Sequence, residues 1–154
     1  MKAQLLIVDD ELDIQELLQR RYRYAGHSVE TASSGAEALA KLEQTRTDLV
    51  ITDIMMPGMD GVDLLRAIRK NYPTVRVIVI TGHVTQARIL ACMRLGAETC
   101  VFKPFEDLTE LDGAVAQAVQ NIRRWWDILA QLQGKKSLFP AAPSTTPPRS
   151  NSGE

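Results

Sequence analysis

Short apolar runs alternate with segments of helical spacing along most of this chain. Five such runs, of which the second is the least apolar, cover residues 5–8, 28–32, 49–53, 75–80 and 99–102. Runs of this length, rich in valine, isoleucine and leucine, predict strands. Between them apolar residues recur three and four positions apart, which predicts helices from Leu12 to Gly26, from Ser33 or Ser34 to Leu42, over 62–70 and 86–95, and from about Glu106.

This alternation is typical of an α/β domain in which helices cover both faces of a parallel sheet. Right-handed crossovers and short connections leave few strand orders, and we expect the doubly wound, flavodoxin-like order 2-1-3-4-5. In that order the sheet has a switch point between strands one and three, and ligands bind beyond the carboxyl ends of the strands there. That crevice is where we look for function.

Ionisable and polar side chains stand at the ends of four predicted strands. Asp9 and Asp10 follow the first strand and Asp53 ends the third, while Thr81 and Lys103 end the fourth and fifth. Two carboxylates about 5 Å apart repel by roughly 3 kcal/mol at an effective dielectric near 20, so the cluster favours a cation. Carboxylate oxygens with room for water suit Mg²⁺. The lysine and the hydroxyl would be idle in a metal site alone, and they favour an incoming anion such as a phosphoryl group.

Each of these residues also has an ordinary structural interpretation. The acidic run 9–11 suits the start of a helix, because negative charge is favoured there by the helix dipole. Asp53 could cap a strand end, Thr81 could belong to a turn, and Lys103 could be a solvated surface charge. Taken singly these interpretations compete well, but four strand ends that supply complementary groups to one crevice favour a working site.

Composition and charge exclude several other classes of protein. The chain has 154 residues, 45% of them hydrophobic, and a net charge of −1, so it lacks the basic surplus of a nucleic-acid binder. No apolar run approaches the roughly 20 residues that span a membrane, and the first apolar run is too short for a signal peptide. We therefore expect a cytoplasmic protein with no membrane insertion, in which Cys92 and Cys100 are reduced, packed thiols.

Four motifs resemble the receiver domain of two-component response regulators. They are Leu6-Ile7-Val8-Asp9-Asp10-Glu11, the stretch from Asp53 to Gly61 (Asp-Ile-Met-Met-Pro-Gly-Met-Asp-Gly), Thr81-Gly82 and Lys103-Pro104-Phe105. Their spacing is similar to that of the family, and the resemblance covers about residues 3–122. It implies a signalling switch rather than an enzyme: Asp53 would accept a phosphoryl group from the histidine of a sensor kinase or phosphotransfer protein, and would lose it slowly. Output would come through changed protein contacts or a phosphorelay.

The resemblance also implies a role for each residue of the crevice. Asp10, Asp53 and the backbone carbonyl of Met55 would ligate Mg²⁺, with Asp9 acting directly or through a water molecule. Lys103 would pair with one phosphoryl oxygen, and Thr81 would hydrogen-bond another. The Lys103-Pro104 peptide would be cis, as in the family. No other cofactor is implied.

The chain departs from the family pattern at one position that matters for the switch. Receivers usually carry tyrosine or phenylalanine three residues before the lysine, and here the residue is Cys100. Phe102 shares its strand face and could substitute in part, although it lies nearer the strand end. Otherwise the switch works without a moving ring, or a different side chain moves. We expect the phosphoprotein to form normally, with modest changes on the fifth-strand face. His83 either is solvated or tunes the access of water to the phosphoaspartate, and the loop methionines, 55, 56 and 59, are expected to pack in the loop.

The last predicted helix is longer than a receiver needs. Apolar residues alternate three and four apart at Leu108, Leu111, Val115, Ala118, Ile122, Trp125, Leu129 and Leu132, a coiled-coil pattern. The first half would pack on the sheet, while an extension over 123–133 would mediate self-association as a homodimer, or partner binding. Residues 134–154, rich in proline, serine and threonine, are expected to be a disordered tail, and we expect the chain to be a stand-alone receiver.

Two other functions compete with this interpretation. The chain could be an unphosphorylated scaffold or dimerisation module that uses the same fold and helical extension, although the complete set of Asp10, Asp53, Thr81 and Lys103 argues against it. A phosphatase of the haloacid type would need a second aspartate two residues after the nucleophile, and position 55 is methionine.

Overall fold

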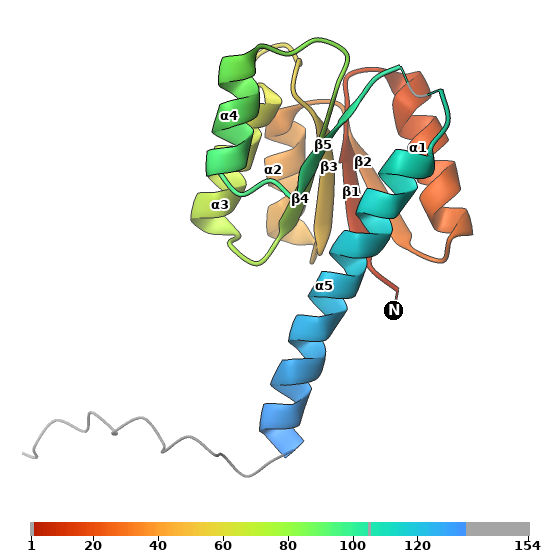
Figure 1. Ribbon diagram of the computed structural model, residues 1–154, viewed down its shortest axis with the longest axis vertical. Helices are drawn as coiled ribbons and strands as arrows, with labels where there is room; N and C mark the ends of the chain where they lie inside the picture. The colour runs from red at the N-terminus through yellow and green to blue at the C-terminus, as the bar shows by residue number, and fades with distance from the viewer. Residues whose placement is uncertain (1, 105, 135–154) are drawn as a thin grey trace, which may run out of the picture. The chain divides into compact units, whose positions relative to one another are not determined.

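The strands and helices follow the predicted alternation. The structure, a computed structural model, describes residues 2–104 and 106–134. Its elements are β1 (Gln4–Val8), α1 (Leu12–Tyr24), β2 (Ser28–Ala32), α2 (Gly35–Gln44), β3 (Leu49–Asp53), α3 (Gly61–Asn71), β4 (Arg76–Thr81), α4 (Gln86–Arg94), β5 (Thr99–Phe102) and α5 (Thr109–Gly134) (Figure 1). Each predicted strand is present to within one residue at either end.

The five strands form one parallel sheet in the order β2-β1-β3-β4-β5, which confirms the predicted order. The register pairs Val8 with Thr52 and Asp53 with Ile80. The carboxyl ends of β1, β3 and β4 therefore lie side by side, and the residues that follow these strands meet at one edge of the sheet.

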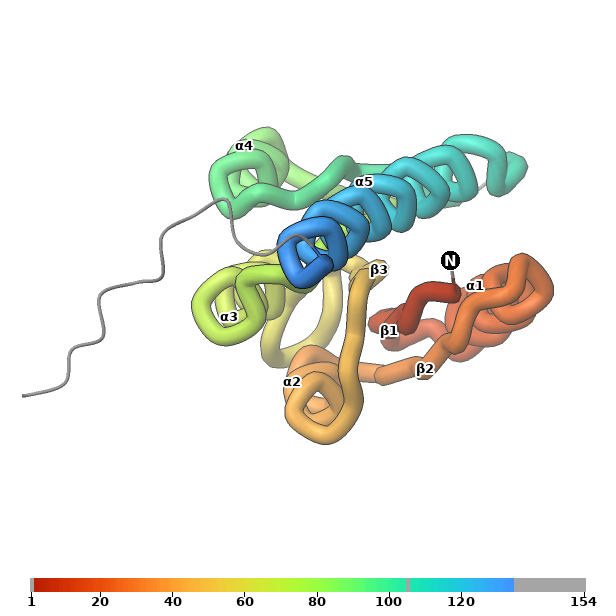
Figure 2. Tube along the Cα trace, turned by 90° about the horizontal axis from the view of Figure 1, so that it is seen from below, coloured from red at the N-terminus to blue at the C-terminus, as the bar shows by residue number. Residues whose placement is uncertain are grey.

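Helices cover both faces of the sheet, as Figures 1 and 2 show. On one face α1 and the first part of α5 pack over Ile7, Ile51 and Ile78. On the other face α2, α3 and α4 pack over a second buried cluster that includes Leu6 and Val50. Because β1, β3 and β4 are buried on both faces, their sequences read as continuous apolar runs rather than as alternating ones.

Polar side chains fix where the helices begin. Ser34 caps α2 by accepting a hydrogen bond from the Glu37 amide at 3.1 Å, and Asp60 caps α3 in a reciprocal capping box with Asp63. The predicted start of α5 near Glu106 is wrong by three residues. The Asp107 side chain accepts a hydrogen bond from the Thr109 amide at 2.9 Å, so the chain turns before the helix begins at Thr109.

The chain divides into two compact units, residues 1–123 and 124–154, and the boundary falls within α5. In the first unit Leu111, Val115, Ala118 and Ile122 are buried in the core, as the sequence predicts. In the second unit the described residues continue the helix to Gly134, and Trp125, Leu129 and Leu132 are exposed. The predicted tail beyond Gly134 lies outside the described residues. Within the part of the chain that is described, no helix is both long and apolar enough to cross a membrane.

Candidate functional site

Three carboxylates meet at the carboxyl ends of β1 and β3. Asp9, Asp10 and Asp53 each offer an oxygen atom, and these atoms all lie within 4.8 Å of one another. Asp9 and Asp53 are buried, whereas Asp10 is exposed. The predicted juxtaposition is therefore present, with two carboxyl groups inside the domain and one at its surface.

Lys103 joins the two buried carboxylates. Its Nζ donates to Asp9 Oδ2 at 2.6 Å and to Asp53 Oδ2 at 3.2 Å, and it lies 3.7 Å from the exposed carboxylate of Glu11. The Lys103-Pro104 peptide is cis, as the resemblance implies. The interpretation of Lys103 as a solvated surface charge is wrong, because only 11% of its side chain is exposed.

Burial and neighbouring charges have opposite effects on the pKa values of Asp53 and Lys103. Burial raises the pKa of the Asp53 carboxyl above its ordinary value, and the charge of Lys103 offsets part of that rise while Asp9 adds to it. Burial by itself would lower the pKa of Lys103, but hydrogen bonding to Asp9 and the charges of Asp9 and Asp53 outweigh it, so that pKa is raised. The lysine therefore stays charged and holds together two carboxylates that burial and mutual repulsion disfavour.

Backbone amides hold the two buried carboxylates, and a buried glutamine holds the main chain at Asp9. The Met55 amide donates to Asp53 Oδ1 at 3.2 Å, and the Glu11 amide donates to Asp9 Oδ1 at 2.9 Å. Gln15 Nε2 donates to the Asp9 carbonyl at 2.6 Å and to Ser33 Oγ at 2.9 Å. Sequence reasoning missed Gln15; the available signal was a polar residue on the inward face of an amphipathic helix.

Gly61 allows the loop after β3 to fold back onto the strand. Its amide donates to the Ile54 carbonyl at 2.8 Å, and a Cβ at this position would lie 2.2 Å from the backbone oxygen of Asp53. No side chain larger than hydrogen fits there without moving the strand end. The glycine thus fixes the backbone that presents Asp53.

Thr81 is fully buried at the end of β4, and its hydroxyl is already engaged. Thr81 Oγ1 donates to the His83 carbonyl oxygen at 2.9 Å. A hydrogen bond from Thr81 to a phosphoryl oxygen would have to replace this one, which would release the loop that carries His83. The hydroxyl is thus linked to the loop before α4.

The three loop methionines behave differently. Met56 is buried and Met59 packs partly against the core, as predicted. Met55 was expected to pack in the same way, and this is wrong: 48% of it is exposed, and its Sδ lies 2.6 Å from Nη1 of Arg88 on α4. The sequence gives no sign of Arg88, since it lies 33 residues away in a segment with ordinary helical spacing.

Cys100 occupies part of the core rather than the crevice. It lies half-buried against the cluster beneath α4, and burial raises the pKa of its thiol to about 11, which keeps it protonated at neutral pH. Phe102 on the same strand is 59% exposed, so its ring is not packed in the core alongside Cys100. Cys92 is buried, and both cysteines are free.

The donor set fits Mg²⁺. Three carboxylates with oxygen atoms within 4.8 Å of one another, one of them open to solvent, suit a hard cation that keeps several water molecules. Lys103 reaches Asp9 Oδ2 and Asp53 Oδ2, while Asp10 makes no contact with it. The Asp10 carboxylate and Asp53 Oδ1, which accepts from the Met55 amide, are therefore not engaged by the lysine and could ligate such an ion.

Comparison with known proteins identifies relatives of this chain. The sequence model of the response regulator receiver domain matches residues 5–116. The probable transcriptional regulator ycf27 of Guillardia theta is 42% identical over 123 residues, which cover 80% of this chain and 48% of the relative. The transcriptional regulatory protein CpxR homolog of Haemophilus influenzae is 39% identical over 105 residues, 68% of this chain and 45% of the relative. The chain thus spans about half the length of the curated relatives it matches.

Solved structures give the same family. The response regulator protein TrrA of Thermotoga maritima, in complex with Mg²⁺-BeF, is 36% identical with a TM-score of 0.68, and the match covers 77% of this chain and 99% of that one. A CheY-like receiver domain protein of Methanospirillum hungatei is 27% identical with a TM-score of 0.76, over 80% of this chain and 98% of that one.

Proposed function

Because this chain belongs to the response regulator receiver family, we propose that Asp53 is the residue that accepts the phosphoryl group. The observation that carries the proposal is the contact of Lys103 Nζ with Asp9 and Asp53 beside the exposed Asp10. A site with one buried ammonium and three carboxylates has a nucleophile, acidic ligands for a cation and a positive charge for an anionic group. These are the parts that phosphoryl transfer needs from a protein.

In the proposed reaction a carboxylate oxygen of Asp53 attacks phosphorus. The bond from oxygen to phosphorus forms as the bond from phosphorus to the donor breaks, and the donor keeps the electron pair. Lys103 binds a phosphoryl oxygen and balances part of the added charge. Thr81 exchanges its hydrogen bond to His83 for one to a second phosphoryl oxygen. The group would be lost slowly when a water oxygen attacks phosphorus: the bond to the Asp53 oxygen breaks, the carboxylate keeps the electron pair, and inorganic phosphate leaves. This is not the turnover of a classical enzyme.

Asp10, Asp53 and the Met55 carbonyl would hold Mg²⁺, with Asp9 acting directly or through water. When bound, the ion neutralises charge on the phosphoryl oxygens. Acetyl phosphate should therefore add one phosphoryl group in the presence of Mg²⁺, and intact mass spectrometry should find no addition after the ion is chelated. Equal uptake with and without the ion would contradict this assignment of the acidic cluster.

The proposed donor is the phosphohistidine of a sensor kinase or phosphotransfer protein. Its imidazole is the leaving group in the step above, and the exposed Asp10 and Glu11 mark the open side of the site. The pair of free thiols favours a cytoplasmic location, where thiols stay reduced. The scaffold alternative is not favoured, since it leaves the buried Lys103 and its two carboxylates without a purpose.

We also propose that the helical extension binds a second copy of this chain. Its apolar side chains, which we call the extension face, are Trp125, Trp126, Ile128, Leu129 and Leu132, each at least 40% exposed. Within this extension, the residues at the seam positions of the heptad repeat and at the positions beside the seam are uncharged. The charged residues Arg123, Arg124 and Asp127 occupy the outer positions of the heptad, on the opposite side of the helix. Two copies would therefore meet without like-charge repulsion.

The size of the extension face suits such a pair. Two half-exposed tryptophans and three aliphatic side chains offer on the order of 500 Å² of apolar surface, so two copies would bury about 1,000 Å² in all. That is near the lower limit for a specific interface, and we expect a dimer that dissociates on dilution.

Sedimentation equilibrium tests this surface. The wild-type chain should show a concentration-dependent dimer, and Leu129→Glu should make it monomeric by placing a charge in the apolar face. Gln131→Glu adds the same charge on the opposite side of the helix, and the dimer should persist. A wild-type chain that stays monomeric at high concentration would contradict the proposal.

A further inference from the structure

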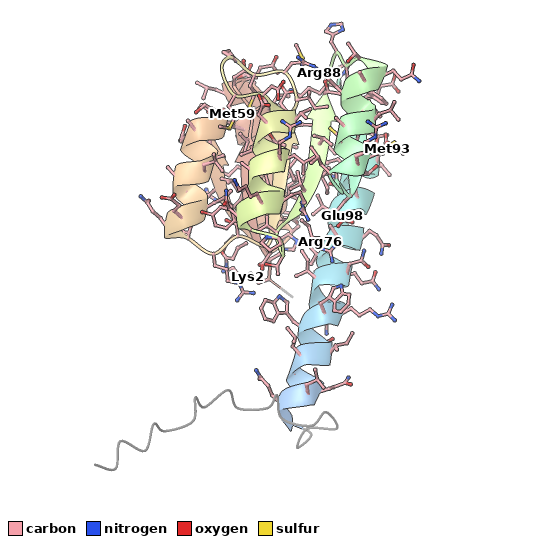
Figure 3. The ribbon with its side chains drawn as sticks, turned by 90° about the vertical axis from the view of Figure 1, so that its left-hand side faces the viewer. Lys2, Met59, Arg76, Arg88, Met93 and Glu98 are labelled. Carbon is pink, nitrogen blue, oxygen red and sulfur yellow. The ribbon has the colours of Figure 1, made fainter. Side chains whose placement is uncertain are left out.

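Arg88 reaches from α4 to the loop that follows β3, the strand that ends in Asp53. Its Nη1 lies 2.6 Å from Met55 Sδ, and its Nη2 lies 3.6 Å from Asp60 Oδ2. In Figure 3 Arg88 lies at the same end of the domain as Met59, and Lys2, Arg76 and Glu98 lie toward the other end. The guanidinium thus touches the residue two positions after Asp53.

The present partners hold this guanidinium weakly. At 3.6 Å the contact with Asp60 is an ion pair without a hydrogen bond, and 37% of the Arg88 side chain is exposed. The thioether sulfur of Met55 is a weak acceptor. The Asp60 carboxylate has another role, because its Oδ1 caps α3 by accepting from the Asp63 amide at 2.9 Å. Arg88 can therefore leave Asp60 while the cap of α3 stays intact.

A phosphoryl group on Asp53 would offer Arg88 a stronger partner. Phosphorylation brings about −1.5 to −2 charge and three acceptor oxygens, and guanidinium groups bind such oxygens in pairs. The single ammonium of Lys103 already contacts both Asp9 and Asp53, so it neutralises only part of the charge that phosphorylation adds. Met55 links the two places, because its amide donates to Asp53 while its sulfur touches Arg88.

We propose that Arg88 exchanges Asp60 for the phosphoryl group on Asp53 and thereby draws the first turn of α4 toward the site. The backbone of that turn is fixed by Thr85, whose Oγ1 accepts from the Arg88 amide at 3.3 Å, so movement of the side chain is passed to the helix. This inference rests on the proposed function of Asp53. It supplies a cationic link to α4 in a chain where Cys100 replaces the usual aromatic ring.

Binding of beryllofluoride with Mg²⁺, measured by titration calorimetry, tests the exchange. Arg88→Ala should weaken binding about fivefold, the effect of an exposed ion pair, and Arg88→Lys should restore part of it. Asp60→Asn keeps a capping side chain but removes the competing charge, so it should strengthen binding by a similar factor. That gain should vanish in the Arg88→Ala background. Arg94→Ala, an exposed arginine on the same helix, should change nothing.

The opposite expected effects of Arg88→Ala and Asp60→Asn on beryllofluoride affinity distinguish the proposed exchange from a purely structural contact between α4 and the loop. If Arg88 and Asp60 only hold α4 against the loop, both substitutions weaken binding together, and the proposal is wrong. It is also wrong if Arg88→Ala binds as tightly as the wild type. Hydrogen exchange gives a second readout, because beryllofluoride should protect amides 89–92 in the wild type and not in Arg88→Ala. A wild type that binds no beryllofluoride would overturn the function of Asp53, and the inference with it.

Discussion

Replacing Lys103 with methionine should slow phosphoryl uptake about a hundredfold and destabilise the domain by about 3 kcal/mol at neutral pH in the absence of Mg²⁺. The ammonium bridges Asp9 and Asp53, both buried, so its removal leaves two like charges without a partner. Rates come from intact mass after mixing with acetyl phosphate, and stability from urea unfolding.

The pH dependence of this variant follows from the Asp53 carboxyl. Its pKa is raised in the folded chain by burial, and loss of Lys103 removes the charge that counteracts the rise. A carboxyl with a raised folded pKa binds more protons when folded, so it lowers stability as the pH rises through that pKa. The difference in unfolding free energy between the wild type and Lys103→Met should therefore shrink as the pH falls. Addition of Mg²⁺ should raise the unfolding free energy of the variant more than that of the wild type. Lys70→Met, at an exposed lysine, should match the wild type; a Lys103 variant that also matches it would contradict the account of the site.

Gly61→Ala should destabilise the domain by about 3 kcal/mol, because the new Cβ would lie 2.2 Å from the Asp53 carbonyl oxygen and 2.7 Å from the Ile54 Cα. These are backbone atoms, which cannot move aside as the end of a flexible side chain can. The strand end that carries Asp53 must shift, so the fraction that stays folded should also accept phosphoryl groups more slowly.

Gly113→Ala is the matched control for this substitution. Gly113 lies inside α5, and a Cβ there meets nothing within 4 Å, so alanine should stabilise the helix by about 0.5–1 kcal/mol. Urea unfolding of both variants should give opposite signs. A Gly61 variant as stable as the wild type would show that the close approach to β3 does not constrain the site.

The architecture was predictable because buried parallel strands leave a strong signal. β1, β3 and β4 each contain a continuous run of valine, isoleucine or leucine, and the crossovers between parallel strands restrict the strand order. Once the order is fixed, residues at the strand ends must converge, which is why Asp9, Asp53 and Lys103 could be placed at one crevice before their distances were known.

Contacts that depend on side-chain conformation were not predictable. Gln15 lies on the inward face of α1, where spacing alone would favour an apolar residue, and its hydrogen bonds to Asp9 and Ser33 require the folded loop. The exposure of Met55 and its contact with Arg88 join segments that are distant in the sequence. The start of α5 depends on an Asp107 turn that competes with helical spacing over the same residues.

The most direct test of the central claim compares the wild type with Asp53→Asn after incubation with acetyl phosphate and Mg²⁺. Intact mass spectrometry should find the addition of one phosphoryl group to the wild type, stable in acid and lost in base, as expected for an acyl phosphate. Asp53→Asn should show no addition, whereas Asp48→Asn, at a buried aspartate that binds the Gln4 amide at the other end of the sheet, should be modified like the wild type. An equal addition to Asp53→Asn, or none to the wild type, would contradict the assignment of Asp53 as the phosphoryl acceptor.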